Sequence, residues 1–424
     1  MPKLYGLSSR IHRFHEPKRR RDALLCIARA AVGCVPRGSK GEVMTSEALQ
    51  AAKAMIGKKG SRAAIPTPAL VLDLDAFERN VARMAEHCKV SNLSIRPHAK
   101  THKCVTIAKA QIAAGAVGQC CAKLGEAEAM AAGGIESILI TSPVVTVQGI
   151  ERLMALNEKM PDLMVVVDNP VNARALAAAA AEKKRVLKVL VDLDVGLHRT
   201  GIRPGEDALA LAELLDAAEF LELRGLQAYA GHLMHIHDFA ERREKSLAAM
   251  KVLGDQRDAL KAKGLPCDIV SGGGTGSYNI DPEAKVLTEL QGGSYVFMDK
   301  QYHDVALGNG ASFPFETSLF VQMSVVSANT KNLATTDAGF KSFSTDAESP
   351  KLLSGAPEGA GYFFFGDEQG GVLLPDGASL PIGSVLTAMT PHCDPTVNLY
   401  DAYHVVRGDT LVDIWPIEAR GKSA

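Results

Sequence analysis

A regular alternation of short aliphatic runs with longer helical patterns, beginning near Ile65, constrains the fold of this 424-residue chain most strongly. The aliphatic runs are rich in β-branched residues, and alanine- and glutamate-rich stretches of helical periodicity separate them. Eight strands with intervening helices predict a (β/α)₈ barrel, with an open doubly wound sheet as the alternative. The expected strands lie near residues 93–97, 117–121, 137–141, 163–168, 186–193, 223–229, 267–271 and 294–298.

The pattern changes beyond about Gly308, where helical periodicity ends. Short alternating runs separated by Gly, Pro and Asp follow, as is typical of antiparallel strands. A chain of this length is too long for one ordinary core. We therefore expect a barrel over residues 62–308 and an all-β domain over residues 309–424, with the strand near residues 69–73 as a candidate member of the second.

The first 61 residues differ from the rest and are expected to form a disordered extension. Residues 1–43 hold ten Lys and Arg against three acidic residues. A transit peptide, a nucleic-acid-binding arm and an over-extended start are the alternatives for such a basic, acid-poor segment.

The composition excludes several classes of protein. A net charge of -1 gives no bulk attraction to nucleic acid or membranes, and no apolar run approaches the roughly 18 residues of a membrane span. The eight cysteines lack metal-finger or disulfide-framework spacing. Reduced thiols in a cytoplasmic protein, with neither a nucleic-acid nor a membrane partner, are the simplest expectation.

Lys100 directly follows the first expected barrel strand, and catalytic groups of barrels lie at the C-terminal ends of strands. Four basic residues lie near it in sequence: Arg96, His98, His102 and Lys103. Like charges lower the pKa of a lysine, which favours an amine nucleophile that forms a Schiff base with a carbonyl group. A surface lysine in a basic loop is the alternative.

Later strand ends contribute further candidates. Arg199 follows one expected strand, and Tyr229 ends the next, with His232, His235 and His237 just after it. The glycine-rich run Ser271–Ser277 also follows a strand, and its Gly273, Gly274, Thr275 and Gly276 are typical of a phosphate site because glycines let backbone N–H groups approach an anion. A flexible turn is the alternative.

The segment His392-Cys393-Asp394 is a candidate metal site. On an extended chain, residues two apart project to the same side, so His392 and Asp394 would offer nitrogen and oxygen to one cation while Cys393 points away. Mixed N/O ligation suits Mn²⁺, Mg²⁺ or Zn²⁺.

Together these residues resemble the D-threonine aldolase and D-serine dehydratase family, the metal-dependent branch of the alanine-racemase-like enzymes that use pyridoxal 5′-phosphate. The resemblance runs from about Thr67 to Gly421 and includes the motifs 96–103, 271–277, 289–299 and 392–398. It implies a (β/α)₈ barrel of alanine-racemase type followed by a β domain, and a homodimer.

The resemblance also implies roles for single residues. Lys100 would carry pyridoxal phosphate, Arg199 and Tyr229 would contact it, and the glycine run would hold its phosphate. His392 and Asp394 would bind the metal, with Mn²⁺ expected first. His235 would help to move the proton of the substrate hydroxyl. One departure is Ala230, where related aldolases carry a larger polar residue, so the substrate pocket is expected to differ there.

The second metal ligand bears on the reaction. The dehydratase branch carries His-X-Cys, whereas Asp394 here resembles the aldolase branch. We therefore expect a lyase that cleaves the Cα–Cβ bond of D-β-hydroxy-α-amino acids, such as D-threonine, phenylserine or 3-hydroxyaspartate, to glycine and an aldehyde. A D-serine or D-threo-3-hydroxyaspartate dehydratase, a racemase and a non-catalytic pyridoxal-phosphate-binding protein are the alternatives.

Overall fold

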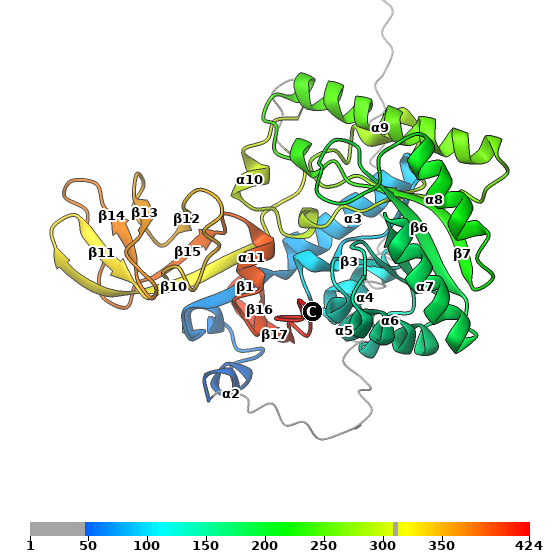
Figure 1. The fold of residues 1–424 in the computed structure, drawn as a ribbon. Helices are drawn as coiled ribbons and strands as arrows, with labels where there is room; N and C mark the ends of the chain where they lie inside the picture. Colours follow the sequence, from blue (N-terminus) through cyan, green and yellow to red (C-terminus); the bar gives the residue numbers. More distant parts are fainter. Residues whose placement is uncertain (1–46, 308–312) are drawn as a thin grey trace, which may run out of the picture. The chain divides into compact units, whose positions relative to one another are not determined.

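Eight parallel strands form the first sheet of the computed structural model, which describes residues 47–307 and 313–424 (Figure 1). Their order is β2-β9-β8-β7-β6-β5-β4-β3. A parallel bridge between His98 and Cys120 joins the two ends, so the sheet closes into a barrel. The strands are β2 (Ser94–Ile95), β3 (Gln119–Cys121), β4 (Ile138–Ile140), β5 (Leu163–Val167), β6 (Leu187–Leu193), β7 (Leu221–Ala228), β8 (Ile269–Gly272) and β9 (Glu289–Leu290).

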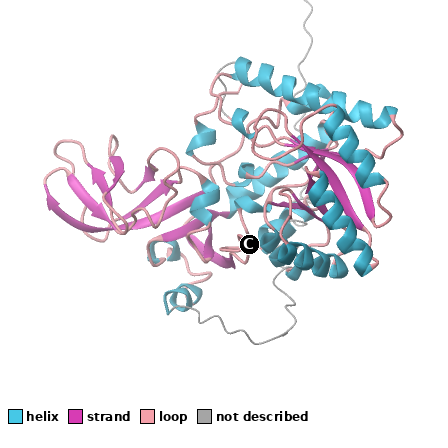
Figure 2. Ribbon diagram, in the orientation of Figure 1, coloured by secondary structure: helices cyan, strands magenta, loops and turns pink. Residues whose placement is uncertain are grey.

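Helices connect these strands and lie on the outer side of the sheet (Figure 2). Because helices cover the outside and side chains fill the inside, central strands such as β5 are buried at every position. The barrel prediction is thus confirmed. The helices are α3 (Leu74–Val90), α4 (Val105–Ala113), α5 (Leu124–Ala132), α6 (Val147–Lys159), α7 (Pro170–Lys183), α8 (Glu206–Asp216) and α9 (Phe239–Ala262).

The expected strand at residues 294–298 is wrong. That segment is the 3₁₀ turn η5 (Ser294–Val296), and the last barrel strand is β9, a few residues earlier. The run looked like a strand because Tyr295, Val296 and Phe297 are apolar, but their side chains are buried in a turn that follows two glycines. Burial alone does not distinguish a short strand from a buried turn.

The second sheet has nine strands in the described residues, and its pairing is mainly antiparallel. β1 pairs with β10 on one side and with β16 on the other, so the chain enters this sheet before it builds the barrel. The strands are β1 (Ala69–Asp73), β10 (Leu319–Thr330), β11 (Leu333–Thr336), β12 (Lys351–Ser354), β13 (Gly361–Phe364), β14 (Gly370–Leu373), β15 (Val385–Met389), β16 (Ala402–Arg407) and β17 (Thr410–Pro416).

Part of the segment expected to be disordered is ordered. Residues 47–53 form α2 (Glu47–Lys53), and Ala52 is buried in a small cluster with Val71 and Leu411. The expectation of disorder therefore fails for residues 47–61, because this stretch has apolar residues to bury, whereas residues 1–46 lie outside the described part. No helix in residues 47–307 or 313–424 is both long and apolar enough to span a membrane.

Candidate active site

Lys100 lies in the turn that leaves β2. This turn is the 3₁₀ helix η2 (Ala99–Thr101), in which Ala99 and Thr101 are buried while 39% of the Lys100 side chain is exposed. Its Nζ forms an ion pair with Asp394 Oδ2 in α11 (Cys393–Val397), although the two residues are 294 positions apart. The end of a barrel strand and the C-terminal segment therefore meet at this amine.

Two buried ion pairs hold the chain on either side of Lys100. Arg96 makes a bidentate pair with Glu289, with N–O distances of 2.8 and 2.9 Å. Lys103 Nζ lies 2.6 Å from Glu126 Oε1. Buried pairs of this kind contribute little net stability, but removing one partner is costly, so they fix geometry. They position the turn that carries Lys100.

The expectation that basic neighbours lower the pKa of Lys100 is wrong. The two cations just described are each neutralised by a carboxylate. Burial lowers the pKa of His98 well below its ordinary value and that of His102 to about 4, so both rings are neutral. Burial also acts to lower the pKa of Lys100, but the charge of Asp394 outweighs it and raises that pKa.

The glycine run after β8 is built to receive an anion. The loop is buried, yet no hydrogen-bond acceptor for the N–H groups of Gly274, Thr275 and Gly276 is found among the described residues. Buried backbone donors nearly always have a partner, so three adjacent ones fit a phosphate group. A Cβ on Gly276 would lie 2.2 Å from Met234 O, and one on Gly273 would lie 2.6 Å from Asp281 Oδ2. The loop thus leaves no room for side chains.

Tyr229 connects this loop to the lysine. It directly follows β7, and a Cβ on Gly274 would lie 3.3 Å from its ring. Burial raises the pKa of the Tyr229 phenol, while the charge of Lys100 opposes the increase. Arg199 Cζ lies 5.5 Å from the centre of the same ring. The structure thus brings Lys100, Arg199, Tyr229 and the glycine run together, as a cofactor with an aldehyde at one end and a phosphate at the other requires.

His235 lies between β7 and α9, with its ring centre 4.6 Å from that of Tyr302. Burial, with a smaller electrostatic contribution from His392, lowers its pKa to about 4. The ring is therefore neutral near pH 7 and able to accept a proton. The electrostatic influence of His392 and Asp394 places His235 in the same neighbourhood as the proposed metal pair.

His392 and Asp394 do not lie on the extended chain that we expected. His392 is the N-terminal cap of α11, and Asp394 lies in its first turn. Burial acts to raise the pKa of Asp394, but Lys100 and His392 together lower it, so the carboxylate is ionised. Cys393 is buried, and its N–H donates to Asp299 Oδ2 at 2.8 Å. The expectation that its side chain points away from the pair is wrong, because its Sγ lies 3.4 Å from Asp394 Oδ1 in the turn of α11.

The donor set fits a divalent cation with open positions. His392 supplies nitrogen and Asp394 supplies oxygen, and two protein ligands leave room for water and substrate. Within the described residues, no group of three or more His, Cys, Asp or Glu side chains is arranged to hold a metal.

Two residues beside this pair were not predicted from the sequence. They are Asp346, whose Oδ2 lies 2.7 Å from His392 Nδ1, and Asp299, which accepts from the N–H of Cys393. Asp346 has no local signal because it lies in a loop 46 residues before its partner.

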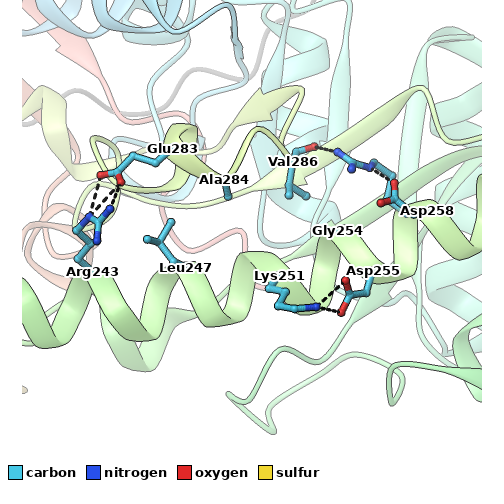
Figure 3. Close-up of a pocket in the computed structure, with 10 residues that line it drawn as sticks. Arg243, Leu247, Lys251, Gly254, Asp255, Asp258, Glu283, Ala284 and Val286 are labelled. Atoms are coloured by element: carbon cyan, nitrogen blue, oxygen red, sulfur yellow. Dashed lines mark hydrogen bonds and ion pairs between the residues drawn. The ribbon is translucent and has the colours of Figure 1, made fainter.

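The pocket in Figure 3 lies elsewhere, between α9 and the 3₁₀ helix η4 (Asp281–Ala284). Its charged side chains already pair with one another, as Arg243 does with Glu283 and Lys251 does with Asp255. Because these charges neutralise each other, the pocket offers no convergent polar group to a substrate. The cluster around Lys100 is the better candidate.

Comparison with known proteins is consistent with this geometry. The family domain described as "Alanine racemase, N-terminal domain" matches residues 72–301, and the "Putative serine dehydratase domain" matches residues 318–406. The chain is 39% identical over 362 residues to a 3-hydroxy-D-aspartate aldolase of Paracoccus denitrificans, covering 84% of this chain and 93% of that protein. It is also 39% identical over 364 residues to a D-threonine aldolase of Arthrobacter sp, covering 85% and 94%.

A dehydratase and a solved structure complete the comparison. The D-threo-3-hydroxyaspartate dehydratase of Delftia sp. is 30% identical over 376 residues, covering 83% of this chain and 97% of that protein. The crystal structure of D-threonine aldolase from Filomicrobium marinum superposes with a TM-score of 0.82 at 38% identity, covering 85% of this chain and 97% of that one. The chain belongs to the D-threonine aldolase and D-serine dehydratase family of alanine-racemase-like proteins.

Proposed function

We propose that this protein is an aldehyde-lyase that cleaves the Cα–Cβ bond of D-β-hydroxy-α-amino acids, giving glycine and an aldehyde. The observation that carries the proposal is the meeting of Lys100 with the His392 and Asp394 pair at one end of the barrel. This contact supports the proposal, because the amine proposed to hold the cofactor lies beside the two side chains proposed to bind a metal. The relatives named as aldolases are 39% identical to this chain, whereas the dehydratase is 30% identical.

Pyridoxal phosphate is the cofactor that the family implies, and the residues present fit it. Lys100 would hold its aldehyde end through Nζ, and the N–H groups of Gly274, Thr275 and Gly276 would hold its phosphate. Tyr229 and Arg199 would orient its ring. When bound, the cofactor supplies an electron sink for the electron pair left at Cα.

A divalent cation is the second group that we propose, with Mn²⁺ first and Mg²⁺ or Zn²⁺ as alternatives. His392 Nε2 and a carboxylate oxygen of Asp394 would bind it. A cation at this place supplies Lewis acidity toward the substrate hydroxyl. The neutral imidazole of His235 would accept the hydroxyl proton as the Cα–Cβ bond breaks. The hydroxyl carbon leaves as an aldehyde, and a proton added at Cα completes glycine.

A dehydratase that releases an oxo acid and ammonia is the second candidate. In that branch, the resemblance places a cysteine where this chain has Asp394. The neighbouring Cys393 does not substitute for it, because burial raises the pKa of its thiol well above the ordinary value and disfavours the thiolate that binds metals. The aldolase reaction is therefore the better supported.

Aldehyde release from D-threonine tests the proposal. The protein loaded with pyridoxal phosphate and Mn²⁺ should release acetaldehyde from D-threonine but not from L-threonine, as followed by coupled reduction with an alcohol dehydrogenase. Treatment with EDTA should stop the release, and added Mn²⁺ should restore it. Release that survives thorough chelation would contradict the role of the metal, and no release from any D-β-hydroxy amino acid would contradict the lyase activity.

We also propose that the active form is a cytoplasmic homodimer.

A further inference from the structure

The imidazole of His392 is held by a carboxylate outside the metal pair. Its Nδ1 lies 2.7 Å from Asp346 Oδ2, and its backbone N–H donates to Ser344 Oγ at 3.1 Å. Both partners come from the loop between β11 and β12, 46 and 48 residues before His392. One short segment therefore contacts both the ring and the backbone of this histidine.

We propose that Asp346 is a positioning residue that fixes the tautomer and ring orientation of His392 so that Nε2 faces the cation. The inference rests on the proposed function, because it requires His392 to bind a metal. An ionised carboxylate only accepts hydrogen bonds, so Nδ1 must carry the proton in this contact. The remaining nitrogen, Nε2, then has the free lone pair that a metal needs.

The backbone around His392 is fixed by a closed set of hydrogen bonds. Ser344 Oγ accepts from His392 N, Ser344 N donates to Thr396 Oγ1 at 3.0 Å, and Thr396 Oγ1 donates to His392 O at 2.8 Å. Ser344 and Thr396 are both buried. The Asp346 segment and the first turn of α11 are thus tied together without the carboxylate, and Asp346 is left to orient the ring.

The exposure of the Asp346 side chain indicates that it contributes little to the stability of the fold. Half of the Asp346 side chain is exposed, compared with 24% of the His392 side chain. Exposed ion pairs contribute at most about 1 kcal/mol to stability. Removing the carboxylate should therefore leave the fold nearly unchanged while the imidazole becomes free to rotate or to change tautomer.

The experiment measures Mn²⁺ affinity rather than turnover. Full-length protein carrying pyridoxal phosphate is stripped of metal with EDTA and titrated with Mn²⁺, with free Mn²⁺ followed by electron paramagnetic resonance. Asp346→Ala should raise the Kd for Mn²⁺ about 10- to 100-fold, the usual effect of losing such a partner. Asp346→Asn should raise it less, because its amide oxygen still accepts from Nδ1–H. Asp367→Ala, at an exposed position of the same domain, is the matched control and should keep the wild-type Kd.

Thermal unfolding and the Asp394→Ala variant provide two further controls for the Mn²⁺ titration. The Tm of Asp346→Ala should match that of Asp367→Ala, and if Asp346→Ala does not fold, the Kd of Asp346→Asn decides. A wild-type Kd in the Asp346 variants, with Mn²⁺ binding lost in Asp394→Ala, would overturn the positioning role alone. A wild-type Kd in Asp394→Ala would instead overturn the metal site of the proposed function.

Discussion

The carboxylate of Asp281 lies beneath the glycine run, where Ser277 Oγ donates to its Oδ2 at 2.5 Å. Only 2% of Asp281 is exposed. Burial raises its pKa from 3.8 to about 7, and the hydrogen bond from Ser277 only partly opposes this. Between about pH 4 and pH 7, the folded protein therefore holds a proton that the unfolded chain has released.

This shift makes stability fall as the pH rises. Because the folded state binds more protons in this window, the free energy of unfolding decreases by up to about 1.4 kcal/mol per pH unit. In the Asp281→Asn variant, the side-chain amide cannot ionise but keeps an oxygen that accepts a hydrogen bond from Ser277. Urea unfolding at about pH 4.5 and pH 7.5 should show the wild type losing stability relative to Asp281→Asn. Equal changes in the two proteins would contradict the raised pKa.

Single residues also show where sequence reasoning is strong and where it fails. The grouping of Lys100 with Tyr229 and the glycine run was predictable, because parallel strands of a barrel end on the same face. Asp394 follows β15 of the second sheet, so only the family resemblance placed it in the same site. The direction of the pKa shift of Lys100 was not predictable in this way. Its sequence neighbours are paired or neutral in the fold, and the decisive charge on Asp394 is 294 residues away. Asp346 was missed for the same reason.

At the scale of elements, the buried glycine run after β8 makes a direct prediction. A Cβ at Gly276 would lie 2.2 Å from the backbone oxygen of Met234, which cannot move as a side chain does. Gly276→Ala should therefore displace the loop and raise the Kd for pyridoxal phosphate about tenfold or more, because the N–H groups lose their alignment. Absorbance titration of the cofactor-free protein measures this.

Gly366→Ala is the control for that experiment, because a Cβ there would meet nothing within 4 Å. It should bind the cofactor as the wild type does. Wild-type affinity in Gly276→Ala would show that this loop does not hold the phosphate.

The elements themselves were largely predictable from hydrophobic patterning. Seven of the eight expected barrel strands overlap β2 to β8, since buried parallel strands read as continuous aliphatic runs. The prediction of the eighth strand failed because β9 has only two residues, Glu289 and Leu290, and one of them is charged. Glu289 is buried only because it pairs with Arg96, a long-range contact that no local pattern reveals.

At the scale of the whole molecule, the candidate site joins segments far apart in the chain. Lys100 belongs to the barrel, whereas His392 and Asp394 follow β15 of the second sheet. A metal ion at this pair would bind the folded protein more tightly than the unfolded chain, since folding fixes His392 at the N-terminal cap of α11 and Asp394 in its first turn. Ligands of that kind stabilise the fold by about 2.7 kcal/mol at one hundred times their Kd.

Mn²⁺ should therefore raise the Tm of the metal-free protein by a few degrees, as measured by scanning fluorimetry. The increase should vanish in Asp394→Ala, which lacks one of the two ligands. The same increase in that variant would show that the cation acts elsewhere in the protein.

The identity of the products tests the central claim most directly. The protein with pyridoxal phosphate and Mn²⁺ is incubated with D-threonine in ²H₂O, and the reaction is followed by ¹H NMR. Cleavage of the Cα–Cβ bond predicts acetaldehyde together with glycine that carries one deuterium at Cα, in equal amounts. The appearance of 2-oxobutyrate and ammonia instead would contradict the account.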